Sequence, residues 1–283
     1  MSILVIGSTG HIGSLVVEQL IAKGGNVTAL IHKTEAKFSK DVPTVKGDVT
    51  DPETMREAFK GIDTLFVLNP VVADELNRAL LTLDLAVEAG IRRVVYFSMF
   101  HADTFLDCPH ACAKYATELM LQKFQIPATI LRPNYFFQND GEPVTKTHVY
   151  PMPIGSLGVS MADARDIAEV AALELIKRDT AAGLLPPALI EIHGPDVITA
   201  ESAIKTWSNV LNKKVIYPGD DLKIAEKQLR KKMPGNMAYD VTRMIAGFQR
   251  EGMVAMPEMV DKVIALLGRP LRTYQNYAKE MAN

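Results

Sequence analysis

The sequence predicts an α/β protein whose core is a doubly wound parallel sheet, followed by a smaller α/β C-terminal lobe. Short apolar runs of strand length alternate with helical patterns through the first half of the 283 residues. This alternation is typical of βαβ units, which place helices on both faces of a parallel sheet. The length allows one large domain or two closely joined ones. After about residue 140 the pattern loosens and prolines cluster, which indicates a different second lobe.

The elements of the first half follow one another in a regular order. Residues 3–6 form a β-branched run, and apolar residues then recur at helical spacing over 12–21. The Gly24-Gly25 pair ends that helix before a second strand at 27–31.

A second helix is expected to start at Asp51-Pro52-Glu53 and to extend to about Lys60. The three residues combine an N-cap, a first-turn proline and an acid that suits the helix dipole. The later elements of this half are expected at residues 64–68, 76–89, 94–97, 113–124 and 129–131.

We expect residues 1–140 to form the sheet domain and residues 141–283 to form the smaller lobe. The lobe has a helical pattern at 164–177 and a strand pattern at 189–192. No linker rich in Gly, Ser or charge separates the two, so the lobe is expected to contribute to the sheet and not to fold independently. Further short helices are expected at 200–211, 221–232, 236–251 and 256–267.

Charge and composition exclude several classes of protein. Lys plus Arg number 31 and Asp plus Glu number 33, so the net charge is −2, without charged blocks. A nucleic-acid-binding protein needs a basic face that displaces counterions from phosphates, so no nucleic-acid partner is expected. Hydrophobic residues make up 48% of the chain, which excludes a disordered or collagen-like protein. No apolar run reaches the roughly 18 residues of a membrane span, so no membrane-spanning helix is expected. No basic stretch is followed by an apolar segment at the N-terminus, so no targeting leader is expected.

Two cysteines, Cys108 and Cys112, are too few for a disulfide framework, and a reduced, cytoplasmic location is expected. They lie in a segment crowded with possible metal ligands. Their spacing is not that of paired Cys-x-x-Cys ligands, and no second pair occurs elsewhere, so no metal site is expected. The other possible ligands of this segment are His101, Asp103, Asp107 and His110.

The strongest chemical motif is Gly-Ser-Thr-Gly-His-Ile-Gly at residues 7–13, between the first strand and the first helix. Its glycines permit a tight turn, a close approach of the backbone to a pyrophosphate, and close packing of helix on sheet. The helix that follows presents free N–H groups to anionic oxygens. A glycine turn without a ligand is the alternative, but the strand–turn–helix context favours a Rossmann-type dinucleotide site. The residues expected at this part of the cofactor are Gly7, Thr9, Gly10, His11, Ile12 and Gly13.

The end of the second strand indicates which dinucleotide binds. NAD sites usually place an acid there for the ribose 2′-hydroxyl, whereas this chain has no acid before Glu35. The His32-Lys33 pair suits a 2′-phosphate, so NADP(H) is favoured over NAD(H), and a solvated loop charge at Lys33 is the alternative. Asp48, after the third strand, is a candidate acceptor for the adenine amine or a turn-forming residue.

Several later segments share a pattern with a known family. His110, Lys114 and Glu118 follow one another at four-residue intervals, and Leu-Arg-Pro-Asn-Tyr-Phe-Phe-Gln-Asn stands at 131–139. With these segments the chain resembles the NmrA-like family, an atypical branch of the short-chain dehydrogenase/reductase superfamily. The resemblance covers nearly the whole chain and continues through residues 163–168, 192–195 and 267–273.

The resemblance implies NADP(H) in the crevice at the carboxyl edge of the sheet and a small substrate-facing lobe. Further cofactor contacts are expected from Val49, Asn69, Lys114, Pro133 and Tyr135.

The chain departs from the superfamily at one catalytic position. The superfamily's pair is Tyr-x-x-x-Lys, in which the tyrosine passes a proton and the lysine holds the ribose. Here His110 stands at the tyrosine position and Lys114 is kept, four residues apart and therefore on one helix face. An imidazole is able to relay a proton because its ordinary pKa is about 6.5. Tyr115 points about 100° away from Lys114 and is a poor substitute, while Ser98 is a candidate for orienting a substrate carbonyl or for capping a turn.

The residues therefore favour an NADPH-dependent reductase of a small apolar or aromatic electrophile, such as a quinone, enal or azo compound. In this interpretation Lys114 binds the nicotinamide ribose and His110 is the candidate proton donor. The alternative is a non-catalytic NADP(H)-sensing regulator that binds another protein. A nucleotide-sugar epimerase or dehydratase is disfavoured because the catalytic tyrosine is missing. Five methionines of the second half are candidates for lining an adaptable substrate pocket, and membership of the ordinary hydrophobic core is the alternative. They are Met152, Met161, Met233, Met237 and Met253.

Overall fold

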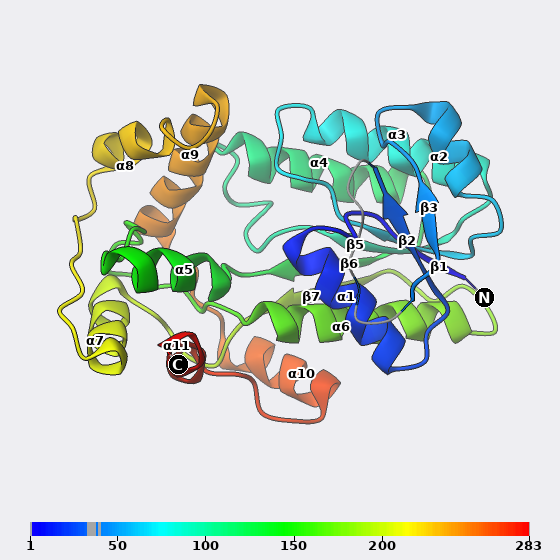
Figure 1. Cartoon of the computed structure of the whole chain (residues 1–283). Coiled ribbons are helices and arrows are strands. Elements are labelled where there is room, and N and C mark those ends of the chain that lie inside the picture. Colours follow the sequence, from blue (N-terminus) through cyan, green and yellow to red (C-terminus); the bar gives the residue numbers. More distant parts are fainter. Residues whose placement is uncertain (1, 33–37, 39–40, 283) are drawn as a thin grey trace. The chain divides into compact units, whose positions relative to one another are not determined.

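The computed structural model describes residues 2–32, 38 and 41–282 and contains one seven-stranded sheet (Figure 1). The strand order is β3-β2-β1-β4-β5-β6-β7, and the strands run parallel. This order confirms the predicted doubly wound sheet, because the chain leaves the central strand β1 in one direction and returns beside it at β4. The strands are β1 (Ile3–Val5), β2 (Val27–Ile31), β3 (Thr44–Lys46), β4 (Thr64–Val67), β5 (Arg93–Phe97), β6 (Thr129–Pro133) and β7 (Ala188–Ile192).

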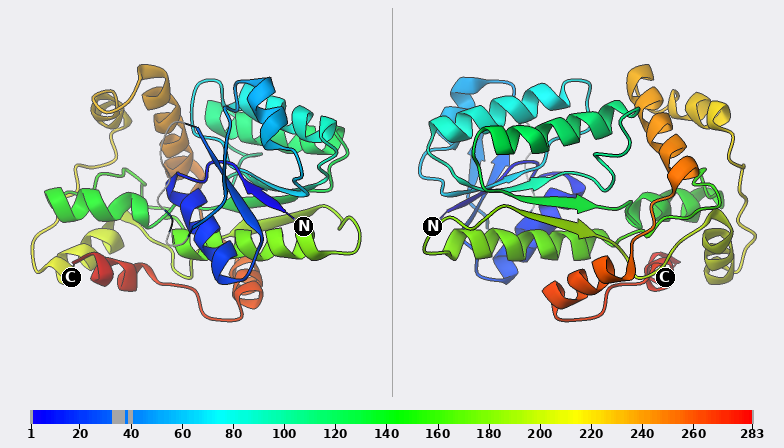
Figure 2. Two further views of the ribbon diagram at one scale, coloured as in Figure 1. Left: turned by 45° about the vertical axis from the view of Figure 1, so that its right-hand side comes forward. Right: turned by 180° about the vertical axis from the view of Figure 1, so that it is seen from behind.

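Helices cover both faces of this sheet, as parallel strands require. Helices α1 (His11–Ala22) and α6 (Ala164–Thr180) lie on one face. Helices α2 (Pro52–Ala58), α3 (Glu75–Glu88) and α4 (Pro109–Lys123) lie on the other, and the two views of Figure 2 show both layers.

The core between the sheet and helices α2, α3 and α4 follows the strand period of two. Leu4 and Leu65 are neighbours in the parallel register of β1 and β4, and both have 0% exposure. Alternate residues along each strand share one sheet face, and Val67, Val94 and Tyr96 belong to the same buried cluster. The apolar runs that suggested strands are therefore buried because helices cover both faces.

The chain divides into two compact units. Unit 1 comprises residues 1–99, 113–132 and 167–190 and contains the sheet. Unit 2 comprises residues 100–112, 133–166 and 191–283. The helices of unit 2 are α5 (Gln138–Thr147), α7 (Ala200–Leu211), α8 (Leu222–Leu229), α9 (Gly235–Glu251), α10 (Pro257–Leu267) and α11 (Tyr274–Ala282).

Unit 2 is centred on large aromatic side chains. Helix α11 packs on α5 and α7, and the Trp207 indole donates a hydrogen bond of 2.8 Å to the Tyr274 hydroxyl. That hydroxyl in turn donates to Asp140 Oδ2 at 2.6 Å. Met161 and Met253 are buried in this unit, at 0% and 2% exposure.

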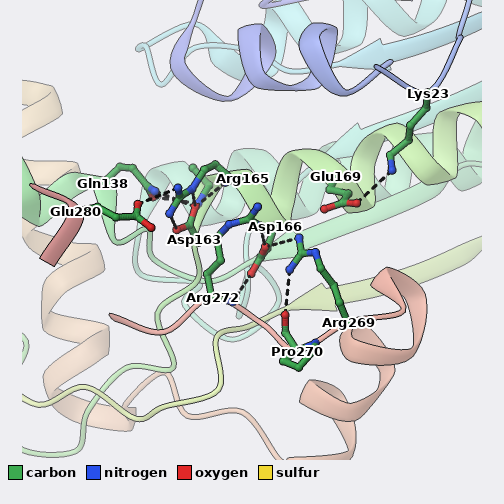
Figure 3. A network of polar contacts seen from close by, with 11 residues as sticks. Lys23, Gln138, Asp163, Arg165, Asp166, Glu169, Arg269, Pro270, Arg272 and Glu280 are labelled. Atoms are coloured by element: carbon green, nitrogen blue, oxygen red, sulfur yellow. Dashed lines mark hydrogen bonds and ion pairs between the residues drawn. The ribbon is translucent and has the colours of Figure 1, made fainter. Parts of the chain in front are cut away.

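Arginine–aspartate pairs hold the end of unit 2 (Figure 3). The buried Asp166 carboxylate forms an ion pair with Arg269 at 2.8 Å and accepts a hydrogen bond from the Arg272 backbone N–H at 2.9 Å. Arg165 binds Asp163 and also reaches Glu280 of α11 at 2.8 Å. These contacts fix residues 269–282 against the segment that leads into α6.

Helices α5 and α11 were not predicted, and α4 begins four residues before the predicted start. Asp240 of α9 explains the early start of α4, because its Oδ1 accepts the His110 backbone N–H at 2.9 Å and so satisfies a free helix donor. Among the helices described here, none has both the length and the apolar character needed to cross a membrane.

Candidate functional site

The carboxyl ends of the first four strands surround a cavity of about 370 Å³ in unit 1. Such crevices, beside the point where the strand order reverses, are the usual ligand sites of open α/β sheets. Its lining residues come from the glycine loop and from the segments that follow β2, β3 and β4. They are Ile6, Gly7, Thr9, Leu30, His32, Gly47, Asp48, Val49, Thr50, Leu68, Asn69, Pro70 and Arg78.

The glycine loop is packed too closely for side chains at two of its three glycines. Gly7 has φ +75°, and a Cβ there would lie 2.7 Å from the Leu68 carbonyl oxygen. A Cβ at Gly13 would lie 2.0 Å from the Gly7 carbonyl oxygen. Both glycines are therefore required by the fold of the loop itself.

Gly10 differs, and its surroundings suit a ligand. Its φ of −80° is open to any residue, and an added Cβ would meet only the Gly7 carbonyl oxygen, at 3.3 Å. Gly10 is the N-cap of α1, and no side chain in the described part of the protein caps this helix end or adds an acid to its first turn. The N–H groups of the first turn, at His11, Ile12 and Gly13, are therefore available to an anion.

Asn69 provides a second sign of a ligand in the cavity. It follows β4, is 3% exposed, and lines the cavity. Neither its amide nitrogen nor its amide oxygen has a hydrogen-bond partner among the residues that the structure describes. A buried amide without partners is costly, so this residue fits a site that a polar ligand completes.

Polar residues of both charges gather where β2 and β3 end. The Asp48 Oδ1 accepts hydrogen bonds from the Thr50 hydroxyl and N–H, at 2.7 and 2.9 Å. These bonds, assisted by His32 with Nδ1 3.5 Å from Oδ2, hold the pKa of Asp48 below its usual value. Arg78 also lines the cavity, with its Nε bonded to Asp74 at 2.9 Å. Lys33, predicted beside His32, lies outside the described residues.

Arg78 was missed in the sequence. The available signal was its place one turn into the helix that follows β4, because such a helix begins at the carboxyl edge of the sheet.

Lys114 of α4 is almost fully buried, with 3% exposure. Its Nζ donates to the Phe97 carbonyl oxygen at 2.9 Å and lies 2.8 Å from Oε1 of Glu75. The ammonium also stands 5.5 Å from the centre of the Tyr96 ring, a favourable cation–π distance. Glu75 is 4% exposed, so the two residues form a buried ion pair.

Ser98 is held within a different network. Its hydroxyl donates to Oε1 of Glu118, and Arg132 binds the same carboxylate through Nε and Nη2 at 3.0 and 2.6 Å. All three side chains are buried. Because the Ser98 hydroxyl already donates a hydrogen bond to Glu118, it links the end of β5 to α4 and is not directed at an open site.

Three of the predicted site residues belong to unit 2 and are described within it. His110 lies in the first turn of α4, where its N–H is held by Asp240. Pro133 ends β6, and its carbonyl oxygen accepts the Phe100 N–H at 2.9 Å. The Tyr135 ring packs edge-on against Phe248, with centroids 6.0 Å apart.

Two of the possible metal ligands near His110, Asp107 and Cys108, attach residues 100–112 to α9. Asp107 forms ion pairs with Arg243 and Arg250. Cys108 Sγ lies 3.3 Å from Asp240 Oδ1, and burial raises the pKa of this thiol to about 12.

Comparison with models of known protein families identifies the family of this chain. The model of the NmrA-like family matches residues 1–278. The chain belongs to the NmrA-like family. Its fold is accordingly the atypical short-chain dehydrogenase/reductase type of NAD(P)-binding fold.

Distant relatives of this NmrA-like chain include reductases. The NAD(P)H azoreductase of Xenophilus azovorans is 28% identical over 289 residues, which cover 99% of this chain and 98% of the azoreductase. The NADPH-dependent quinone oxidoreductase of Escherichia coli, solved with NADPH, has a TM-score of 0.83 at 20% identity, covering 100% of this chain and 99% of that one. Triphenylmethane reductase of Citrobacter sp., solved with NADP(H), has a TM-score of 0.81 at 20% identity and covers both chains completely.

Proposed function

We propose that this protein is an NADPH-dependent reductase of a small apolar or aromatic electrophile, of the quinone, enal or azo type. The observation that carries the proposal is the cavity at the carboxyl edge of the sheet, which is lined by Gly7 and Thr9 of the loop before the uncapped helix α1 and by the buried, unpartnered amide of Asn69. A whole-length relationship to an NAD(P)H azoreductase supports the same class of reaction.

The residues present fit a dinucleotide. The first turn of α1 and Gly10 would hold the pyrophosphate, and Asn69 with Asp48 would face the polar edge of the adenosine. Arg78 would supply positive charge for a 2′-phosphate, and His32 would supply a ring N–H donor. NADPH, when bound, supplies hydride.

Two groups of α4 would take part in the reaction itself. Lys114 would donate a hydrogen bond to the nicotinamide ribose, and the His110 imidazole would donate a proton to the reduced acceptor. Ser98 is left out of this proposal because its hydroxyl already donates to Glu118.

Cofactor preference gives the first test. We expect NADPH to bind about ten- to hundredfold more tightly than NADH, because the 2′-phosphate gains at least one charged hydrogen bond worth about 1.5–3 kcal/mol. Calorimetric titration of both cofactors measures this directly. Equal or tighter binding of NADH would overturn the assignment of NADP(H).

A dinucleotide sensor is the second candidate function. Two observations favour it: the catalytic tyrosine is replaced by His110, and Lys114 is already engaged by Glu75. Turnover separates the two candidates. If the protein is a reductase, absorbance at 340 nm should fall when NADPH and the protein are mixed with a quinone, an enal or an azo dye. Tight NADPH binding without NADPH oxidation across this panel would favour the sensor.

A further inference from the structure

The buried ion pair between Lys114 and Glu75 joins two elements of unit 1 that are far apart in sequence. Lys114 Nζ lies 2.8 Å from Glu75 Oε1, and neither side chain is more than 5% exposed. A lone buried ammonium is strongly disfavoured, and removing one partner of a buried pair leaves the other charge uncompensated. Glu75 therefore supplies the counter-charge of the buried Lys114 ammonium.

Glu75 lies in the same segment of the chain, after β4, that lines the cavity. It is the first residue of α3, and the loop before it supplies Leu68, Asn69 and Pro70 to the cavity wall. One turn further along α3, Arg78 lines the same cavity. The segment after β4 thus carries cavity-lining residues together with the counter-charge of Lys114.

The Lys114 ammonium is held between a backbone carbonyl and a carboxylate. An ammonium has three N–H donors. In the part of the chain that the structure describes, one of them donates to the Phe97 carbonyl oxygen, and the Glu75 carboxylate lies beside the ammonium as its ion-pair partner. The hydrogen bond to Phe97 and the ion pair with Glu75 fix the position of Nζ, and donor capacity remains for a ligand.

We propose that Glu75 is the positioning residue of Lys114: it supplies the counter-charge of the buried ammonium and holds Nζ in place to donate a hydrogen bond to the nicotinamide ribose. This inference rests on the proposed function, because it requires a dinucleotide in the cavity. Glu75 itself does not touch the cofactor and acts only through Lys114.

The test compares NADPH with adenosine 2′,5′-bisphosphate, a fragment that lacks the nicotinamide ribose. We expect Glu75→Gln to weaken NADPH binding about ten- to hundredfold, similar to Lys114→Met, because a charged hydrogen bond is lost in both. Affinity for the fragment should change less than threefold in either variant. Calorimetry measures both ligands, and a purely structural role of Glu75 would weaken them equally or not at all.

A double variant tests whether Glu75 acts through Lys114. In the Lys114→Met background, adding Glu75→Gln should leave NADPH affinity unchanged, because the pair is already absent. Glu75→Asp keeps the charge but withdraws the carboxylate, and it supplies the same comparison should Glu75→Gln fail to fold. It should weaken NADPH binding severalfold and leave the fragment unaffected.

Glu174→Gln is the matched control, because Glu174 is also a buried carboxylate of unit 1, 2.9 Å from Lys177 and 3.0 Å from the Thr129 hydroxyl. It should leave the affinity for NADPH and for the fragment unchanged. Unchanged NADPH affinity in folded Glu75→Gln or Glu75→Asp would overturn the inference while leaving the proposed function intact. Failure of the unmodified protein to bind either ligand would instead overturn the proposed function.

Discussion

His110 and Lys114 stand four residues apart on α4, and the chemistry expected of them differs. His110 would exchange a proton with the substrate, whereas Lys114 would hold the cofactor. The first group should therefore affect the chemical step and the second should affect binding. This difference makes the two residues separable by experiment.

We expect His110→Ala to lower the turnover number about 10²- to 10⁴-fold, the usual contribution of general acid catalysis, with NADPH affinity nearly unchanged. Lys114→Ala should instead weaken NADPH binding by about 1–3 kcal/mol. Steady-state kinetics with a quinone and calorimetry with NADPH measure the two effects.

Tyr115→Phe is the control for this experiment and should alter neither quantity, because Tyr115 lies on a different side of α4. Unchanged turnover in His110→Ala would remove His110 from the reaction. Water would then supply the proton, and the protein would contribute cofactor binding and substrate positioning.

At the scale of elements, the glycine loop and α1 separate folding from binding. Gly13 packs against the Gly7 carbonyl and admits no side chain, whereas a Cβ at Gly10 would meet only the Gly7 carbonyl oxygen, at 3.3 Å. The fold of the loop therefore requires Gly7 and Gly13, whereas Gly10 is the glycine for which we propose a role in binding.

We expect Gly10→Val to keep its circular-dichroism spectrum and to lose at least about a hundredfold in NADPH affinity, because the added side chain occupies the phosphate position. Gly13→Ala should lower the free energy of unfolding by roughly 1–3 kcal/mol, because the backbone must move apart. Urea denaturation and calorimetry on both variants measure these outcomes. Normal NADPH binding by a folded Gly10→Val protein would contradict the assigned role.

Helix α5 shows why one element escaped prediction. Gly141 and Pro143 lie inside it, and both residues are poor helix formers. A Cβ at Gly141 would lie 2.1 Å from the Tyr277 hydroxyl, so the glycine is explained by the close approach of α11. Tertiary packing therefore overrides the low helix propensity of these residues, and no sequence pattern within residues 138–147 predicts a helix.

At the scale of the molecule, the polar core of unit 2 links stability to pH. Asp140 is fully buried, and burial raises its pKa to about 7 although the hydroxyls of Tyr274, Tyr150 and Tyr135 oppose the shift. In the unfolded chain its pKa is about 3.9. Between pH 4 and 7 the folded protein therefore binds a proton that the unfolded chain has lost, so Asp140 contributes less stability as the pH rises through this range.

Asp140→Asn should remove this dependence, because an amide stays neutral at every pH. The difference in unfolding free energy, unmodified protein minus variant, should fall by up to about 4 kcal/mol between pH 4 and 7 and stay level above pH 8. Urea denaturation at pH 4, 5, 6, 7 and 8 measures this difference. A constant difference across the series would show that Asp140 does not titrate in this range.

The amino-acid sequence by itself determined the parallel sheet and the glycine loop, whose Gly7 and Thr9 line the cavity at the carboxyl edge of the sheet. These features depend on periodicity and on glycines whose backbone geometry is set within a few residues. Even so, the sequence did not reveal Arg78 as a residue of the same cavity.

Only the tertiary structure decided what the functional side chains contact. It paired Lys114 with Glu75, directed Ser98 to Glu118, and used Asp240 to start α4 at Pro109. Two of these contacts join residues more than 30 positions apart, and even the Ser98 contact links a strand to a helix. The physical reason is that burial makes an unpaired charge or donor costly, and folding alone determines which distant group meets that requirement.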